Sequence, residues 1–93
     1  MKWQFILKNG VHNVVLEHGL TSGKRKIAID GFVEYSEKQP LNRPSTHNFI
    51  LKLIPLRVSI QKQGNFYGYD LRIDGEDFED LRMRALGLAQ QRR

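Results

Sequence analysis

The segment from Gly19 to Arg25 is the part of the sequence closest to a phosphate-binding motif. A nucleotide-binding P-loop has four residues between its glycines and a Ser or Thr after the lysine to hold magnesium. Here three residues separate Gly19 from Gly23, and Arg25 follows Lys24. An alternating strand pattern comes next, in place of the helix whose N-terminus would hold phosphate. The pattern argues against nucleotide hydrolysis and leaves two alternatives, a looser anion site built from Lys24, Arg25 and loop amides, or a solvated basic turn.

The three histidines are the other residues that could bind a metal ion. His12 and His18 lie on one face of the same predicted strand, roughly 20 Å apart, which is too far for both to bind one ion. His47 could join either of them only through the fold, and no carboxylate-rich cluster accompanies it. We therefore expect hydrogen-bonded histidines, with no metal site and no cofactor.

Groups that could perform hydrolysis are also missing from the sequence pattern. Ser22 has no nucleophile-elbow context, and the chain contains no cysteine. Acidic residues gather between residues 74 and 80, where they favour the N-terminus of a following helix through its dipole. We predict a protein without enzymatic activity, because nothing in the sequence specifies a reacting centre.

The aromatic segment 66–69, Phe-Tyr-Gly-Tyr, has two interpretations. It could form a stacking platform for single-stranded nucleic acid. Alternating tyrosines on a strand more often pack against neighbouring strands with their hydroxyls at the surface. We favour packing, because the basic, glycine and aromatic pattern of RNA-binding strands is not met.

Short strands are the elements that would position all these residues. Apolar side chains recur with a period of two, which is typical of half-buried strands. Turn signals separate the runs. Asn9-Gly10 is typical of a type I′ hairpin turn, and Asp30-Gly31 and Asp74-Gly75 are favoured tight hairpin turns. We predict seven or eight antiparallel strands in an all-β sandwich or closed barrel. The predicted strands cover residues 3–7, 12–18, 24–29, 32–35, 47–54, 56–61 and 66–73.

Two segments depart from the alternating pattern. Residues 36–46 contain Pro40 and Pro44 and predict a surface loop between two sets of strands. Residues 78–91 carry apolar side chains at helical spacing and predict a short amphipathic helix. The arginine-rich end could equally be a frayed tail. The predicted organisation is a β-sandwich domain over residues 1–78, followed by an amphipathic helix or basic tail over residues 79–93.

Composition limits the class of protein. The 93 residues make one small domain, and no apolar run is long enough to span a bilayer. The absence of cysteine and of a signal-peptide pattern predicts a cytoplasmic protein. A formal net charge of +5 favours acidic partners, and it leaves nucleic-acid or anionic-surface binding as the alternative function. Its basic clusters are Lys24, Arg25 and Lys26, and Arg82, Arg84, Arg92 and Arg93.

Short His-Gly, Ser-Gly-Lys-Arg and Asp-Gly elements run through the chain in a set order. They occur in the segments Gly10-Val11-His12, Leu16-Glu17-His18-Gly19, Thr21-Ser22-Gly23-Lys24-Arg25, Ile29-Asp30-Gly31, Tyr67-Gly68-Tyr69-Asp70-Leu71 and Ile73-Asp74-Gly75-Glu76. Together with Trp3, this order resembles the first repeat of the Fas apoptotic inhibitory molecule family over roughly residues 3–81.

The resemblance implies a non-enzymatic, cytosolic β-sandwich. It also implies a role in protection from death-receptor signalling or in suppression of protein aggregation. Family members typically carry two sandwiches in tandem, so the chain is expected to be either a fragment or a divergent single-domain member.

A protein-interaction module is the first functional hypothesis. Its predicted contact surface is Leu20, Thr21 and Ser22 with Lys24 and Arg25, joined by exposed residues of the 36–46 loop. Leu20 stands out because an apolar side chain in a loop flanked by glycines has little core to enter. The alternative for this loop is a plain strand connector. An exposed edge strand such as residues 1–7 could also pair with a second copy of the chain.

Overall fold

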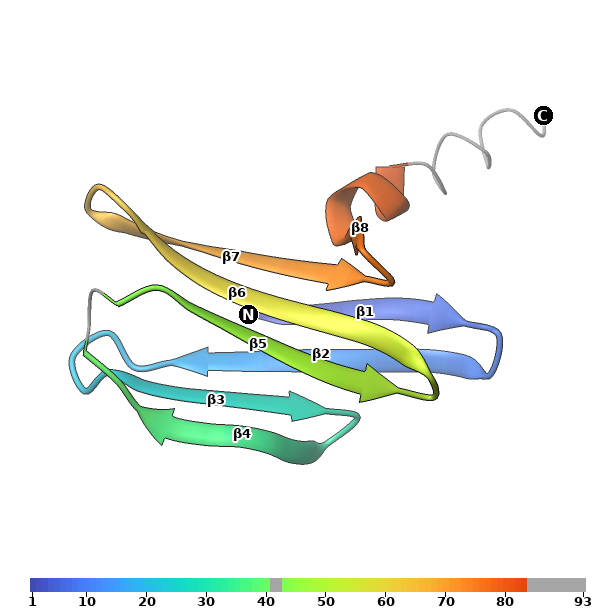
Figure 1. The fold of residues 1–93 in the computed structure, drawn as a ribbon, viewed down its shortest axis with the longest axis horizontal. Helices are drawn as coiled ribbons and strands as arrows, with labels where there is room; N and C mark the ends of the chain where they lie inside the picture. Colours follow the sequence, from blue (N-terminus) through green and yellow to red (C-terminus); the bar gives the residue numbers. More distant parts are fainter. Residues whose placement is uncertain (41–42, 84–93) are drawn as a thin grey trace. The chain divides into compact units, whose positions relative to one another are not determined.

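The structure is a computed structural model that describes residues 1–40 and 43–83. The chain forms two compact units, Met1–Arg43 and Pro44–Arg93. Each unit contains one four-stranded sheet whose strands follow chain order and pair antiparallel (Figure 1). The predicted all-β class, with seven or eight antiparallel strands and a short C-terminal helix, is confirmed. The predicted boundary after residue 78 stays a prediction.

The sheet of the first unit is a meander of four strands. They are β1 (Lys2–Leu7), β2 (Gly10–His18), β3 (Lys24–Ile29) and β4 (Phe32–Lys38). Their alternation places one set of side chains on a buried face, as a period of two requires. The buried apolar side chains are Trp3, Phe5, Val14, Leu16, Ile27 and Ile29.

The edge strand β4 is irregular. Ile27 pairs with Tyr35 but the next residue, Ala28, pairs with Val33, so Glu34 is an extra residue in β4. A bulge of this kind twists an edge strand and makes it a poorer template for pairing with another chain. The other edge of this sheet is β1, the strand that we predicted could pair with a second copy; that pairing stays a prediction.

The sheet of the second unit is also a meander. Its strands are β5 (Ser45–Leu51), β6 (Ile54–Gln63), β7 (Phe66–Ile73) and the short β8 (Glu76–Asp77). Apolar side chains again alternate onto one buried face, and Tyr67 and Tyr69 are half-buried on the same face of β7 as Leu71. The fully buried or nearly buried residues are Leu56, Val58, Ile60, Leu71 and Ile73.

A short helix over residues 78–83 follows β8. Asp77 caps it, because its Oδ2 atom accepts hydrogen bonds from the backbone N–H groups of Glu79 (3.1 Å) and Asp80 (3.3 Å). The acidic segment therefore serves the helix start, as its position in the sequence predicts. The remainder of the predicted helix, residues 84–91, lies outside the described residues.

The hairpin turns divide into predicted and unpredicted ones. The tight turns predicted at Asp30-Gly31 and Asp74-Gly75 are confirmed, and both positions of each have the positive φ that a type I′ turn requires. The type I′ prediction at Asn9-Gly10 is wrong. Leu7 pairs with Gly10, so Lys8 and Asn9 form the turn, and the positive φ belongs to Gly10 (126°).

Three further features differ from the sequence prediction. The predicted strand 47–54 ends at Leu51, because Lys52 and Leu53 form a turn with φ values of 51° and 69°. Pro55, predicted to interrupt the strands, instead lies inside β6. The predicted 36–46 loop is shorter than expected, since β4 reaches Lys38 and β5 begins at Ser45. The turn at Lys52-Leu53 carries no signal in the sequence, because neither residue type favours a turn with positive φ.

Candidate protein-interaction site

The Gly19–Gly23 loop connects β2 to β3 and is closed by its own hydrogen bonds. The Gly19 N–H donates to the carbonyl of Lys24 (2.8 Å), and the Gly23 N–H donates to the carbonyl of Gly19 (3.0 Å). The hydroxyl oxygen of Ser22 accepts a hydrogen bond from the Lys24 N–H (3.2 Å). These bonds define the shape of the loop without any contribution from the Leu20 and Thr21 side chains.

Gly23 anchors the loop against the segment that follows β4. Its carbonyl accepts a hydrogen bond from the Gln39 N–H (3.0 Å), and its φ is 75°. A Cβ atom at this position would lie 2.1 Å from the Gln39 carbonyl oxygen. Both the positive φ and the close approach of two backbones require glycine here.

The side chains at the tip of the loop point away from the core. Leu20 is 60% exposed. Thr21, Ser22 and Lys24 are exposed as well. Four of the five residues predicted to form a protein-binding surface are therefore accessible, three on the loop and Lys24 at the start of β3. Whether a partner binds them stays a prediction.

Arg25 does not belong to that surface, which corrects the sequence interpretation. Its exposed fraction is 0%, and its Nη2 atom donates to the carbonyls of Arg43 (2.6 Å) and Pro40 (3.3 Å). The cause is the strand alternation, which places Arg25 on the same face of β3 as Ile27 and Ile29. The guanidinium holds the chain after β4 within the first unit, so its role is structural.

The burial of Arg25 also alters the predicted basic cluster. Lys24 is exposed, whereas Lys26 is half-buried in β3. In the second predicted cluster, Arg82 forms an ion pair with Glu79 (3.4 Å). Arg84, Arg92 and Arg93 lie outside the described residues.

The sequence model of one protein family, described as Fas apoptotic inhibitory molecule, matches residues 1–87. The chain belongs to this family. The match confirms the resemblance drawn from the His-Gly, Ser-Gly-Lys-Arg and Asp-Gly elements. It covers both four-stranded sheets, so the Gly19–Gly23 loop and the sheet of the second unit are both within the matched region.

Mammalian proteins named Fas apoptotic inhibitory molecule 1 are among the relatives of this chain. Fas apoptotic inhibitory molecule 1 of Mus musculus is 31% identical over 80 residues, which cover 83% of this chain and 45% of the relative. The Homo sapiens protein of the same name is 30% identical over 80 residues, with the same two coverages. The Rattus norvegicus protein is 31% identical, and the match covers 40% of its length. The chain therefore spans less than half the length of these relatives.

Both ring nitrogens of His12 lie within hydrogen-bond distance of a side-chain oxygen. Its Nδ1 atom lies 2.7 Å from Oδ2 of Asp30, and its Nε2 atom lies 2.8 Å from Oδ1 of Asn9. The second oxygen of Asp30 accepts a hydrogen bond from the Asn13 N–H (2.8 Å). The interpretation of His12 as a hydrogen-bonded structural histidine is confirmed. An Asp-His pair can activate a hydroxyl nucleophile, but here the ring nitrogen that would do so faces an amide.

The other two histidines have separate surroundings. His18 pairs across the sheet with Arg25, and burial together with the positive charge of Arg25 lowers the pKa of His18. His47 lies in the second unit, with its Nε2 atom 3.0 Å from the Ser45 hydroxyl.

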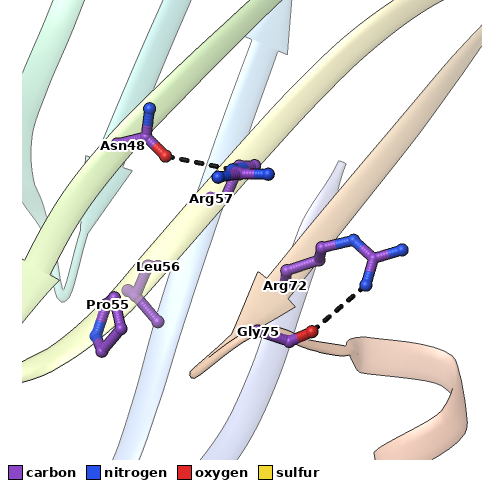
Figure 2. Close-up of a pocket in the computed structure, with 6 residues that line it drawn as sticks. All are labelled: Asn48, Pro55, Leu56, Arg57, Arg72 and Gly75. Atoms are coloured by element: carbon purple, nitrogen blue, oxygen red, sulfur yellow. Dashed lines mark hydrogen bonds between the residues drawn. The ribbon is translucent and has the colours of Figure 1, made fainter.

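Two arginines of the second unit were missed by the sequence interpretation. Arg57 on β6 and Arg72 on β7 are paired residues, and both line one hollow (Figure 2). The predicted turn at residues 63–65 is centred on Gly64 and would place Leu71 opposite Arg57. The structure instead pairs Gln63 with Phe66, so the turn is Gly64-Asn65 and Arg57 lies opposite Arg72.

The described residues contain no helix that is long and apolar enough to cross a bilayer.

Proposed function

We propose that this member of the Fas apoptotic inhibitory molecule family is a non-enzymatic, cytoplasmic protein-interaction module. Its contact surface is the tip of the Gly19–Gly23 loop, with Leu20 as the apolar anchor and Thr21, Ser22 and Lys24 around it. The observation that supports this is a leucine 60% exposed on a loop whose backbone is closed by its own hydrogen bonds. A rigid loop loses little conformational entropy on binding, which favours its use as an anchor.

The biological role rests on the family. The relatives are named for inhibition of Fas-dependent apoptosis. We propose that this chain acts in cell survival, either by regulating apoptosis or by protecting other proteins from aggregation. The His12 ring contacts support the non-enzymatic part of the proposal, because Asp30 and Asn9 occupy the two ring nitrogens.

Affinity capture from a cytosolic lysate at about 150 mM salt tests the proposal, since exposed charges are well screened there. The lysate is treated with nuclease, and Leu20→Asp is compared with wild type. Ile6→Asp is the matched control, because Ile6 is an exposed apolar residue of the same unit (78%). A defined set of proteins lost with Leu20→Asp and kept with Ile6→Asp is the expected result. Equal capture by all three proteins would contradict the proposed surface.

Nucleic-acid binding is the alternative function, and the structure reduces its basis. Arg25 is buried, so one member of the predicted basic clusters is engaged within the fold. Arg82 stays accessible, because its ion pair with Glu79 is exposed and therefore weak. Loss of all captured material on nuclease treatment would favour this alternative over the interaction module.

A further inference from the structure

A row of polar side chains crosses the exposed face of the second sheet. Asn48 on β5 pairs with Arg57 on β6, and Arg57 pairs with Arg72 on β7. Arg72 in turn pairs with Asp77 on β8. Two cations directly opposite one another on neighbouring strands repel, so this arrangement costs stability unless an anion lies nearby.

The two arginines meet at a hollow of about 490 Å³. Pro55 lines the hollow with an apolar side chain, and Asn48 and Gly75 also line it (Figure 2). The Arg57 Nε atom donates to Oδ1 of Asn48 (3.1 Å), and the Arg72 Nη1 atom donates to the Gly75 carbonyl (3.2 Å). These acceptors are neutral, so they orient the two guanidinium groups without cancelling their charge.

Carboxylates of the chain lie on one side of the arginine pair. Oδ2 of Asp70 is 3.7 Å from Nε of Arg72, and both side chains are exposed, so this ion pair is weak. Asp77 is the cross-strand neighbour of Arg72. The Arg57 guanidinium donates to the side-chain amide of Asn48. Among the residues that the structure describes, no carboxylate lies within ion-pair distance of it. Arg57 is therefore available to bind an external anion.

An apolar edge adjoins the arginine pair. Ile50, 70% exposed, pairs with Pro55 and lies on the same face of β5 as Asn48. Leu53 is 91% exposed and lies in the turn that joins β5 to β6. Its φ is 69°. A bulky side chain is rarely held in this left-handed region, and such strain gathers at binding sites. The exposed face thus presents apolar side chains beside two oriented cations.

We propose that this face binds an extended acidic segment of a partner protein. One carboxylate of the segment lies between Arg57 and Arg72, where guanidinium forks can each donate two hydrogen bonds to it. A neighbouring apolar side chain of the segment packs on Ile50 and Leu53. Charge complementarity identifies the acidic part of the ligand, and the exposed Ile50 and Leu53 favour a peptide over a purely polar polyanion. The surface shares no residue with the Leu20 loop, so it goes beyond the function proposed above.

Fluorescence anisotropy with a labelled, end-capped peptide of alternating Asp and Leu tests this proposal. Arg57→Gln and Arg72→Gln are each expected to weaken binding about tenfold or more, since each removes a charged hydrogen-bonding group. Arg82→Gln is the matched control, because it removes the same charge from an exposed arginine outside the row. A peptide with Asn in place of Asp should bind as weakly to wild type as the Asp peptide binds to the variants.

Three results would overturn the proposal. They are equal binding of the Asp and Asn peptides, equal losses in Arg57→Gln and Arg82→Gln, and preference for a single-stranded oligonucleotide or inorganic phosphate over the Asp peptide. Circular dichroism checks that each variant is folded. If a glutamine variant fails to fold, Arg57→Lys and Arg72→Lys replace it, since they keep the charge and lose the fork. The proposal then requires weaker peptide binding in the lysine variants than in wild type.

Discussion

The buried guanidinium of Arg25 links two segments of the first unit that are distant in sequence. It donates to the carbonyls of Pro40 and Arg43, and it also fills space on the core face of β3. The side chain therefore contributes both hydrogen bonds and packing, as buried arginines with a long apolar stem can.

We expect Arg25→Ala to lower the free energy of unfolding by about 3 kcal/mol, through a cavity and two carbonyls that lose their donor. Urea denaturation followed by circular dichroism measures the change. Lys24→Ala, at the neighbouring exposed position, should change stability by less than about 0.5 kcal/mol. Similar losses in the two variants would show that Arg25 is not the structural residue that its burial indicates.

His18 makes the stability of the fold depend on pH. Burial and the charge of Arg25 lower its pKa in the folded chain below the ordinary value of 6.5. The unfolded chain then binds the proton more readily, so this contribution to stability is complete above pH 6.5 and declines as the pH falls from there through the folded pKa. We expect the melting temperature of His18→Gln to fall less than that of wild type between pH 7.5 and pH 5.5.

His47→Gln is the control for this titration, since it removes a histidine from the second unit. Thermal denaturation at the two pH values measures all three proteins. If His18→Gln and wild type show the same dependence over this interval, the lowered pKa of His18 is not what controls it.

At the scale of elements, the Gly19–Gly23 loop depends on a close approach of backbones. Gly23→Ala would place a Cβ atom against the Gln39 carbonyl oxygen and would also occupy a φ of 75°. We expect a loss of about 2 kcal/mol or more in the free energy of unfolding. Gly31→Ala separates the two causes, because Gly31 has a φ of 86° but nothing within 4 Å of its added Cβ. Equal losses in the two variants would leave no role for the contact with Gln39.

The turn at Lys52-Leu53 is the other element with unusual backbone geometry. Leu53→Gly should raise the free energy of unfolding by about 1 kcal/mol, since glycine adopts positive φ without the Cβ penalty. Leu53→Ala keeps the Cβ atom and removes an exposed side chain, so it should change stability little. Chemical denaturation compares both with wild type. A loss of stability in Leu53→Gly would show that the turn is not strained.

The two proposed surfaces lie on different units of the molecule, one on the Gly19–Gly23 loop and one on the face of the second sheet. Variants at sites that share no partner usually have additive effects. We therefore expect Leu20→Asp to leave the affinity for the Asp-Leu peptide within about twofold of wild type. Anisotropy measures this affinity, and a loss as large as that of Arg57→Gln would mean that the two surfaces act together.

Much of this architecture could be predicted from local patterns. A period of two in apolar residues identifies strands wherever it occurs, because side chains of a strand alternate between its two faces. Asp30-Gly31 and Asp74-Gly75 are type I′ turns because these residue types tolerate positive φ. The same alternation already placed Arg25 beside Ile27 and Ile29, although its charge led us to assign it to the surface.

Other features escaped prediction because no local residue type announces them. Lys52 and Leu53 form a turn that their intrinsic preferences disfavour, since the pairing of β5 with β6 determines their backbone. The turn at Lys8-Asn9 shows the same effect, because the pairing of Leu7 with Gly10 moved it by one residue.

The sequence by itself determined the all-β class, seven of the eight strands, the family and an exposed leucine in a loop between glycines. Only the tertiary structure showed that Gly23 meets Gln39, that Arg25 binds carbonyls beyond β4, and that Arg57 and Arg72 share a hollow. The physical reason is the range of the forces involved. Alternation and turn preference act between adjacent residues, whereas close approach, burial of a charge and convergence of side chains depend on how separate strands align.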